Sequence, residues 1–292
     1  MRLLFTIPHY FASSASGNYG SERNTAESRS LVIRRCLASL VQTFSAAQGL
    51  MNGRDRELHP ANPRYAADIT IAVCTTGDRH LVPELDGSGF THIATNVEPR
   101  HLGFECHKVL RDGLGAYDFF GYLEDDLQIA DGLFFAKLGW FNTAMGEQAV
   151  LQPNRFELID DPVPYKLYID GNLHAGAISD VDQNLNAYRR VDMPALGQGV
   201  IFQRVGNPHS GCFFLNAAQM ARWAGQADFG MPSAAFGGPL ESAATLGLMR
   251  HFRVYKPARE NAAFLEIEHL DPRYLGRHFW PEPGNPPRLR WE

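Results

Sequence analysis

Three consecutive carboxylates, Glu124, Asp125 and Asp126, follow a run of aromatic and aliphatic residues in the segment GYLEDDLQIADG. Adjacent charges of one sign at the end of a buried strand are unfavourable, because they repel each other and lose solvation. A divalent cation removes both costs, since Mg²⁺ and Mn²⁺ bind carboxylate oxygens and complete their shells with phosphate oxygens and water. The segment therefore predicts a metal and phosphate site. The alternative is a solvated turn in which Asp125 caps the next helix.

Two further side chains could take part in the same chemistry. Glu241 follows Gly237-Gly238-Pro239 in the first turn of a predicted helix. It could act as a general base toward an attacking hydroxyl, or merely interact well with the helix dipole. His269 ends a predicted strand among acidic neighbours, and a neutral imidazole there could bind a metal or have only a structural role.

Polar residues in three other segments could contact a ligand. Gly211, after His209 and Ser210, would let the backbone approach a sugar or phosphate closely, although a plain turn is the simpler account. Arg23 and Arg29, near the start of the first long helix, could pair with phosphate or solvate the helix face. The segment PNRFE follows a predicted strand and carries polar groups that could meet an acceptor or form a surface turn: Asn154, Arg155 and Glu157.

The elements that must position these residues alternate between strand and helix. Residues 3–7 and 117–123 predict strands, and 67–76 is rich in β-formers. Residues 25–47 have apolar side chains at helical spacing, with Thr25 as the N-cap, and 105–115 predicts another helix. This order favours an α/β fold whose mostly parallel central sheet is flanked by helices on both faces. Ligands of such sheets bind beyond the carboxyl ends of the strands, where the three carboxylates stand.

The second half of the chain continues the mixture of elements, without an internal repeat or a clear linker. The patterns predict a helix over 133–145, a strand and turn over 148–157, two paired strands over 199–204 and 212–216, helices over 216–226 and 238–252, and a Pro-rich tail over 281–292. Nothing in this half separates an independent domain, so we expect one domain.

Composition excludes several classes of function. The chain of 292 residues is 45% apolar and 20% charged, which is ordinary for a folded soluble enzyme. A net charge of -5 gives no basic surface for nucleic acid or anionic lipid. The four cysteines have no metal-finger or CxxC spacing, the first apolar run is too short for a signal peptide, and no stretch could span a bilayer. These features favour the cytoplasm.

FFGYLEDDLQI resembles the DxD region of GT-A glycosyltransferases, in which the motif follows a central strand and binds the metal on a sugar-nucleotide diphosphate. HSGCFFLN is similar to the glycine loop of that superfamily, GPLESAATLGL to its xED motif, and FLEIEHLD to its late metal-binding histidine. The loop after the first strand holds the nucleotide base in that superfamily. Two positions depart from the pattern: the first acid is Glu124, and Glu241 is followed by Ser242.

The resemblance implies a single GT-A-like domain over 1–292, with a nucleotide-binding half at 1–130, an acceptor and catalytic half at 131–280, and a tail at 281–292. It implies transfer of a sugar from a UDP- or GDP-sugar to a hydroxyl acceptor, such as a glycan or other small molecule, with Mn²⁺ or Mg²⁺. The implied roles are Glu124, Asp126 and His269 for the metal; Thr6, Pro8, His9, Asp125, His209, Ser210 and Gly211 for the donor; Asn154, Arg155 and Glu157 for the acceptor; and Glu241 for catalysis.

Two other functions remain open at the level of sequence. A sugar-phosphate nucleotidyltransferase uses a similar sheet and metal carboxylates, but it normally carries a glycine-rich basic loop after the first strand. Here that loop contains SGNYGSER, which matches only weakly. The other alternative is a module that keeps the fold and binds a nucleotide or sugar without catalysis.

Overall fold

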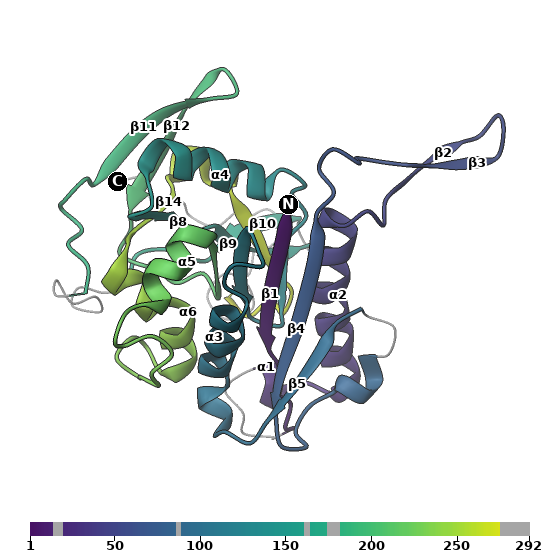
Figure 1. The fold of residues 1–292 in the computed structure, drawn as a ribbon, viewed down its shortest axis with the longest axis horizontal. Coiled ribbons are helices and arrows are strands. Elements are labelled where there is room, and N and C mark those ends of the chain that lie inside the picture. The colour runs from purple at the N-terminus through teal and green to yellow at the C-terminus, as the bar shows by residue number, and fades with distance from the viewer. Residues whose placement is uncertain (14–19, 86–88, 161–163, 174–181, 275–292) are drawn as a thin grey trace.

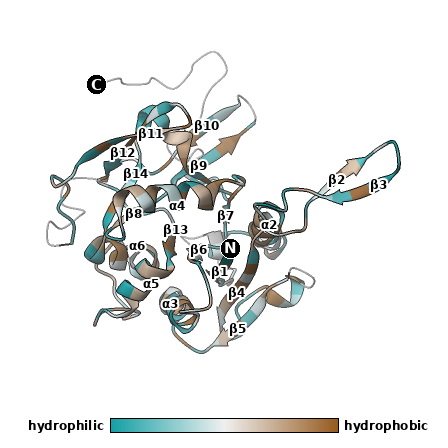
Figure 2. Cartoon of the chain, turned by 45° about the horizontal axis from the view of Figure 1, so that its top comes forward, coloured by the Kyte–Doolittle hydropathy of each residue, from teal (hydrophilic) through white to brown (hydrophobic). Residues whose placement is uncertain are grey.

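The computed structural model describes residues 1–13, 20–85, 89–160, 164–173 and 182–274. Its central sheet has the strand order β13-β6-β1-β4-β5 (Figure 1 and Figure 2). β1 pairs in parallel with both β4 and β6, β4 pairs in parallel with β5, and β13 runs antiparallel to β6. The bounds are Arg2–Pro8 for β1, Asp68–Thr76 for β4, Thr91–Thr95 for β5, Phe119–Leu123 for β6 and Cys212–Asn216 for β13. The expected α/β fold with a mostly parallel sheet is confirmed.

Helices cover both faces of this sheet, because successive side chains of a strand point to opposite faces. Leu3, Phe5 and Ile7 of β1 share one buried cluster with residues of α2 and α4. Leu4 belongs to a second buried cluster, with residues of α3, α5 and α6. The bounds are Ala26–Phe44 for α2, Leu102–Asp112 for α3, Phe134–Met145 for α4, Ala217–Ala224 for α5 and Pro239–His251 for α6. The sheet is thus buried between two helical layers.

Local sequence explains where several helices begin. The Thr25 side chain accepts a hydrogen bond from the backbone N–H of Ser28 at 3.2 Å, so it is the N-cap of α2 as predicted. Asn216 and Gln219 form a reciprocal capping box at the start of α5. The helix expected over 105–115 begins three residues earlier, at Leu102, directly after a 3₁₀ turn over Pro99–His101.

Two four-stranded sheets accompany the central one in the described part of the chain, with strand orders β10-β9-β15-β7 and β11-β12-β14-β8. The predicted pairing of strands 199–204 and 212–216 is wrong. β12 pairs with β11 and β14, whereas β13 pairs with β6 in the central sheet. Four of the five β13 residues are buried, as a strand between helical layers requires. The bounds are Leu127–Gln128 for β7, Ala149–Leu151 for β8, Asn154–Ile159 for β9, Tyr165–Tyr168 for β10, Arg190–Ala195 for β11, Gln198–Arg204 for β12, Arg253–Pro257 for β14 and Glu266–His269 for β15.

A hairpin of β2 (Gly49–Asn52) and β3 (Glu57–Pro60) projects away from the other elements, with both hydrophobic and hydrophilic stretches (Figure 2). Short helical turns complete the described fold: α1 (Gly20–Arg23) and the 3₁₀ helices Val82–Leu85 and Arg259–Phe264. No helix in the described residues is long and apolar enough to cross a membrane.

Candidate active site

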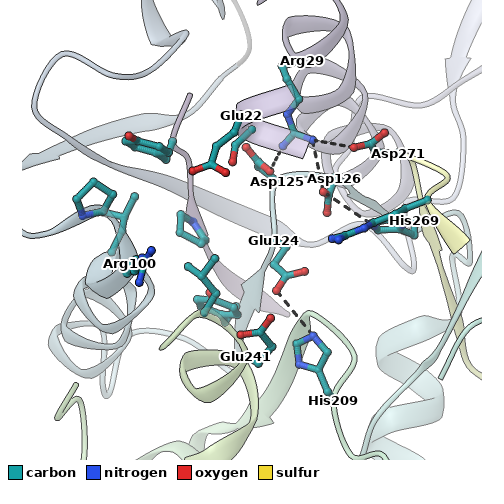
Figure 3. A pocket seen from close by; sticks show the side chains of 18 of the residues that line it. Glu22, Arg29, Arg100, Glu124, Asp125, Asp126, His209, Glu241, His269 and Asp271 are labelled. Carbon is teal, nitrogen blue, oxygen red and sulfur yellow. Dashed lines mark hydrogen bonds and ion pairs between the residues drawn. The ribbon is translucent and has the colours of Figure 1, made fainter. Parts of the chain in front are cut away.

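A pocket of about 390 Å³ lies beyond the carboxyl ends of β1 and β6, where a ligand site was expected (Figure 3). Pro8 and Tyr10 reach it from the end of β1, and the three carboxylates of residues 124–126 reach it from the end of β6. Glu241 enters from α6, and His269 enters from β15. The fold therefore brings the three adjacent carboxylates, the predicted general base Glu241 and the imidazole of His269 to one pocket.

Asp125 uses both of its carboxylate oxygens within the protein. Oδ1 accepts a short hydrogen bond from the Arg29 guanidinium, and Oδ2 is 2.6 Å from His9 Nδ1. His9 Nε2 accepts the backbone N–H of Leu81 at 3.0 Å, so the ring carries its hydrogen on Nδ1 and donates it to Asp125. Burial acts to raise the pKa of Asp125, but Arg29 and His9 outweigh it and lower that pKa to about 2. Asp125 is thus an ionised anchor in the wall of the pocket.

The two carboxylate oxygens of Asp126 differ in their surroundings. Oδ2 is 3.4 Å from Arg29 Nη1 and 3.8 Å from His269 Nε2. Oδ1 is buried and has no hydrogen-bond partner among the described residues. A buried carboxylate oxygen without a donor is costly in a folded protein, and a bound cation would satisfy it.

His269 is oriented by a buried carboxylate. Its Nδ1 lies 2.9 Å from Oε1 of Glu157, whose side chain is fully buried. The same carboxylate accepts the backbone N–H groups of Arg273 and Tyr274, so it is an acceptor and His269 Nδ1 must carry the hydrogen. Burial acts to lower the pKa of His269, but the charges of Asp126 and Glu157 outweigh it and raise that pKa. Metal-binding histidines commonly donate their second N–H to a carboxylate in this way.

Glu124 stands between the Arg155 guanidinium and the His209 imidazole, whose pKa burial lowers well below its ordinary value. Its Oε2 is 3.9 Å from Arg155 Nη1, and its Oε1 is 3.9 Å from His209 Nε2. Burial, and next the charge of Asp126, raise the pKa of Glu124 from 4.5 to about 7. Gly211 packs against this side chain with φ +61°, and a Cβ there would lie 2.5 Å from Glu124 Oε2. The glycine therefore makes room for the carboxylate.

Glu241 occupies the first turn of α6, with two glycines folded around it. A Cβ on Gly238 would lie 2.8 Å from Glu241 Oε2, and a Cβ on Gly237 would lie 3.2 Å from its side chain. The Oε2 atom is buried and has no hydrogen-bond partner within the described part of the chain. This free acceptor in the pocket wall is suited to bind a hydroxyl or to take its proton.

The side chains of the pocket could coordinate a divalent cation only if a bound ligand or water supplied further oxygen atoms. No three His, Cys, Asp or Glu residues of the described chain are close enough together to form a complete metal site. In the pocket, an oxygen of Asp126 and a nitrogen of His269 face each other 3.8 Å apart. Carboxylate and imidazole groups suit Mn²⁺, and Mg²⁺ or Mn²⁺ commonly takes further oxygens from phosphates and water. The site thus supplies part of a coordination shell.

The other predicted ligand residues divide between the pocket and the layer beneath it. Pro8, Arg155 and His209 line the pocket. Thr6 and Ser210 are fully buried, where their hydroxyls donate to the carbonyls of Gly121 and Pro153. Asn154 and Glu157, which were predicted to bind the acceptor, do not line the pocket. Asn154 donates to two backbone carbonyls, and Glu157 accepts a hydrogen bond from His269. The side chain of Arg23 lies outside the described part of the structure.

Sequence reasoning missed several residues of this site. Asp271 lies 4.0 Å from Arg29. Its position two residues after His269 was a signal in the sequence that could have placed it in the site. Arg100 and Arg273 line the pocket but occur in ordinary loop sequence. Asp170 carries no motif at all, yet it is bonded to Arg155 at 2.9 Å.

Comparisons with known proteins find similarity among solved structures. No protein-family model matches the chain, and no curated protein matches it. Among solved structures, the crystal structure of GalNAc-T7 with UDP, GalNAc and Mn²⁺ is similar over 91% of this chain, with 11% sequence identity and a TM-score of 0.47. The match spans 42% of the length of the GalNAc-T7 chain.

Proposed function

We propose that this protein is a glycosyltransferase of GT-A type that moves a sugar from a nucleotide-sugar donor to a hydroxyl acceptor, with Mn²⁺ or Mg²⁺. The observation that supports this most directly is the chain of contacts from Glu157 through His269 to Asp126. It presents the imidazole Nε2 3.8 Å from a carboxylate whose other oxygen has no hydrogen-bond partner among the described residues. Both face a pocket at the carboxyl ends of parallel strands.

Asp126 and His269 would hold the metal, and Glu124 would contribute an oxygen at the same side of the pocket. When bound, the metal neutralises charge that develops on the departing nucleoside diphosphate. Asp125 does not need to contact the ligand, because its contacts with Arg29 and His9 fix the position of the two neighbouring carboxylates. Pro8 and Tyr10 form the wall on which the nucleotide would rest.

Glu241 would act on the acceptor. Its unpartnered Oε2 can accept a hydrogen bond from an acceptor hydroxyl and take the proton as that oxygen attacks the anomeric carbon. The carbon–oxygen bond to the diphosphate breaks in the same event, so the electron pair leaves with the phosphate. This role applies if the configuration inverts; if it is retained, Glu241 would hold the acceptor or the donor sugar.

A panel of UDP- and GDP-sugars, incubated with the protein and Mn²⁺, tests this function without knowledge of the acceptor. Slow transfer to water should release nucleoside diphosphate from one donor of the panel, and EDTA should stop the release. A sugar-phosphate nucleotidyltransferase would instead release pyrophosphate from a nucleoside triphosphate and a sugar phosphate. Absence of both reactions, together with absence of nucleotide binding, would contradict the proposal.

A further inference from the structure

Asp170 is a buried carboxylate that joins two buried cations below the pocket. It lies just after β10, and its side chain is 2% exposed. Its Oδ1 accepts from Arg155 Nε at 2.9 Å, and its Oδ2 accepts from Lys256 Nζ at 2.7 Å and from the Arg155 backbone N–H at 3.0 Å. Burial acts to raise the pKa of Asp170, but Arg155 and Lys256 outweigh it and hold that pKa below its usual value.

Arg155 has two carboxylates within reach. Its Nε bonds to Asp170 at 2.9 Å, while its Nη1 is 3.9 Å from Oε2 of Glu124. The contact with Asp170 is therefore a hydrogen bond, whereas the contact with Glu124 is too long to be one. Because a planar guanidinium bonds a carboxylate best when held in one orientation, the bonds to Asp170 determine how far Arg155 stands from Glu124.

Lys256 connects Asp170 to the opposite side of the same carboxylate. Its Nζ donates to the backbone carbonyl of His209 at 2.6 Å as well as to Asp170. The His209 ring then lies with Nε2 3.9 Å from Glu124, and its Nδ1 is 2.8 Å from the Thr245 hydroxyl. Arg155, bonded to Asp170, and the His209 ring, whose backbone is bonded to Lys256, therefore flank Glu124 without forming a hydrogen bond to it.

We propose that Asp170 is a positioning residue that keeps the Arg155 guanidinium off Glu124, so that this carboxylate stays available to the metal and nucleotide. The inference rests on the proposed function. Asp170 is the carboxylate that bonds to both buried cations, Arg155 and Lys256. Without the charge of Asp170, Arg155 loses its closest counter-charge and turns to Glu124, which then ceases to be a free ligand.

Three variants test this role by calorimetric titration of Mn²⁺ with UDP. Asp170→Asn should weaken binding at least tenfold, which is about 1.4 kcal/mol. Asp170→Asn with Arg155→Met should return most of the affinity, because the competing guanidinium is gone. Asp170→Asn with Lys256→Met restores the charge balance equally well but leaves Arg155 in place, so its binding should stay weak. This double variant also replaces the single one if Asp170→Asn fails to fold.

Equal recovery in both double variants would show a general charge effect and overturn the proposal, as would wild-type affinity in a folded Asp170→Asn. A crystal structure of the Lys256→Met double variant gives an answer independent of function. Arg155 should then lie within about 3 Å of Glu124. If Arg155 keeps its present distance from Glu124, the positioning role is refuted, whether or not the protein binds a nucleotide. If Arg155 moves to Glu124 but the wild type binds no nucleotide, the positioning role stands and only the proposed function fails.

Discussion

His269 donates its Nδ1 hydrogen to Glu157 across 2.9 Å, although the two residues are 112 positions apart in the sequence. The parallel pairing of β15 with β9 produces this contact. Glu268 is opposite Phe156, so the next residues of the two strands, His269 and Glu157, lie side by side. The bond leaves His269 Nε2 directed toward Asp126. A strand pairing thus prepares an imidazole for a metal.

Glu157→Gln should weaken Mn²⁺ binding in the presence of UDP by about 10- to 100-fold, because the imidazole loses the carboxylate that fixes its orientation and increases its basicity. Calorimetry measures the change. Glu266→Gln is the matched control, since Glu266 lies on β15 but pairs with Lys166 and Tyr168 away from the pocket. Equal affinities for Glu157→Gln and the control would remove Glu157 from the site.

Glu124 should make the free protein less stable as pH rises. Its folded pKa of about 7 exceeds the ordinary value of 4.5, so the folded state binds the proton more tightly. This contribution to stability is complete below pH 4.5 and is lost as pH rises through 7. The free energy of unfolding of Glu124→Gln should therefore exceed that of wild type by about 3 kcal/mol at pH 8, and should be near the wild-type value at pH 4.

Urea denaturation at both pH values, without metal, measures that difference. An equal effect of Glu124→Gln at pH 4 and pH 8 would mean that burial does not raise the pKa of this carboxyl. Binding has the opposite pH dependence, because a cation competes with the proton. Mn²⁺ affinity should therefore fall as pH decreases through about 7.

Asp125→Ala and Asp126→Ala should separate folding from ligand binding. Removal of Asp125 leaves the buried Arg29 without its nearest counter-charge, which should reduce the free energy of unfolding by about 3 kcal/mol. Asp126→Ala should reduce it by less than about 1 kcal/mol, because Asp125 still pairs with Arg29. If urea denaturation gave the two variants the same stability, Asp125 would not be the anchor of the acidic segment.

Gly211→Ala should displace Glu124 and weaken Mn²⁺ binding in the presence of UDP by at least tenfold. The added Cβ meets Glu124 Oε2 at 2.5 Å, and φ of +61° adds backbone strain. Gly115→Ala is a close control, because Gly115 has φ +83° but no atom within 4 Å of an added Cβ. Thermal denaturation should show a loss in both variants. Calorimetry should show weaker binding only in Gly211→Ala, and unchanged binding there would disconnect this glycine from the site.

The sequence contained enough information for the sheet and the acidic segment, because both depend on local patterns. Strand β6 ends where the apolar run FFGYL meets three acids, and Thr25 caps α2 as its position predicts. The order of strand and helix then placed the acids at the carboxyl edge of the sheet. Those inferences needed no knowledge of distant contacts.

Long-range pairings could not be predicted in the same way. Nothing in PNRFE distinguishes a surface turn from a strand whose Glu157 supports His269. The pairing of β13 with β6, rather than with β12, depends on competition among several short apolar strands. Asp170 stands in a stretch without clear periodicity, so its bonds to Arg155 and Lys256 appear only in the folded chain.

Metal-dependent nucleotide binding through Asp126 is the central claim, and one calorimetric comparison tests it most directly. UDP or GDP is titrated into wild type and into Asp126→Ala, each with Mn²⁺ and with EDTA. We expect wild type to bind one of the nucleotides only when Mn²⁺ is present, and a folded Asp126→Ala to bind neither. Nucleotide binding that is independent of Mn²⁺, or unchanged affinity in Asp126→Ala, would contradict the account.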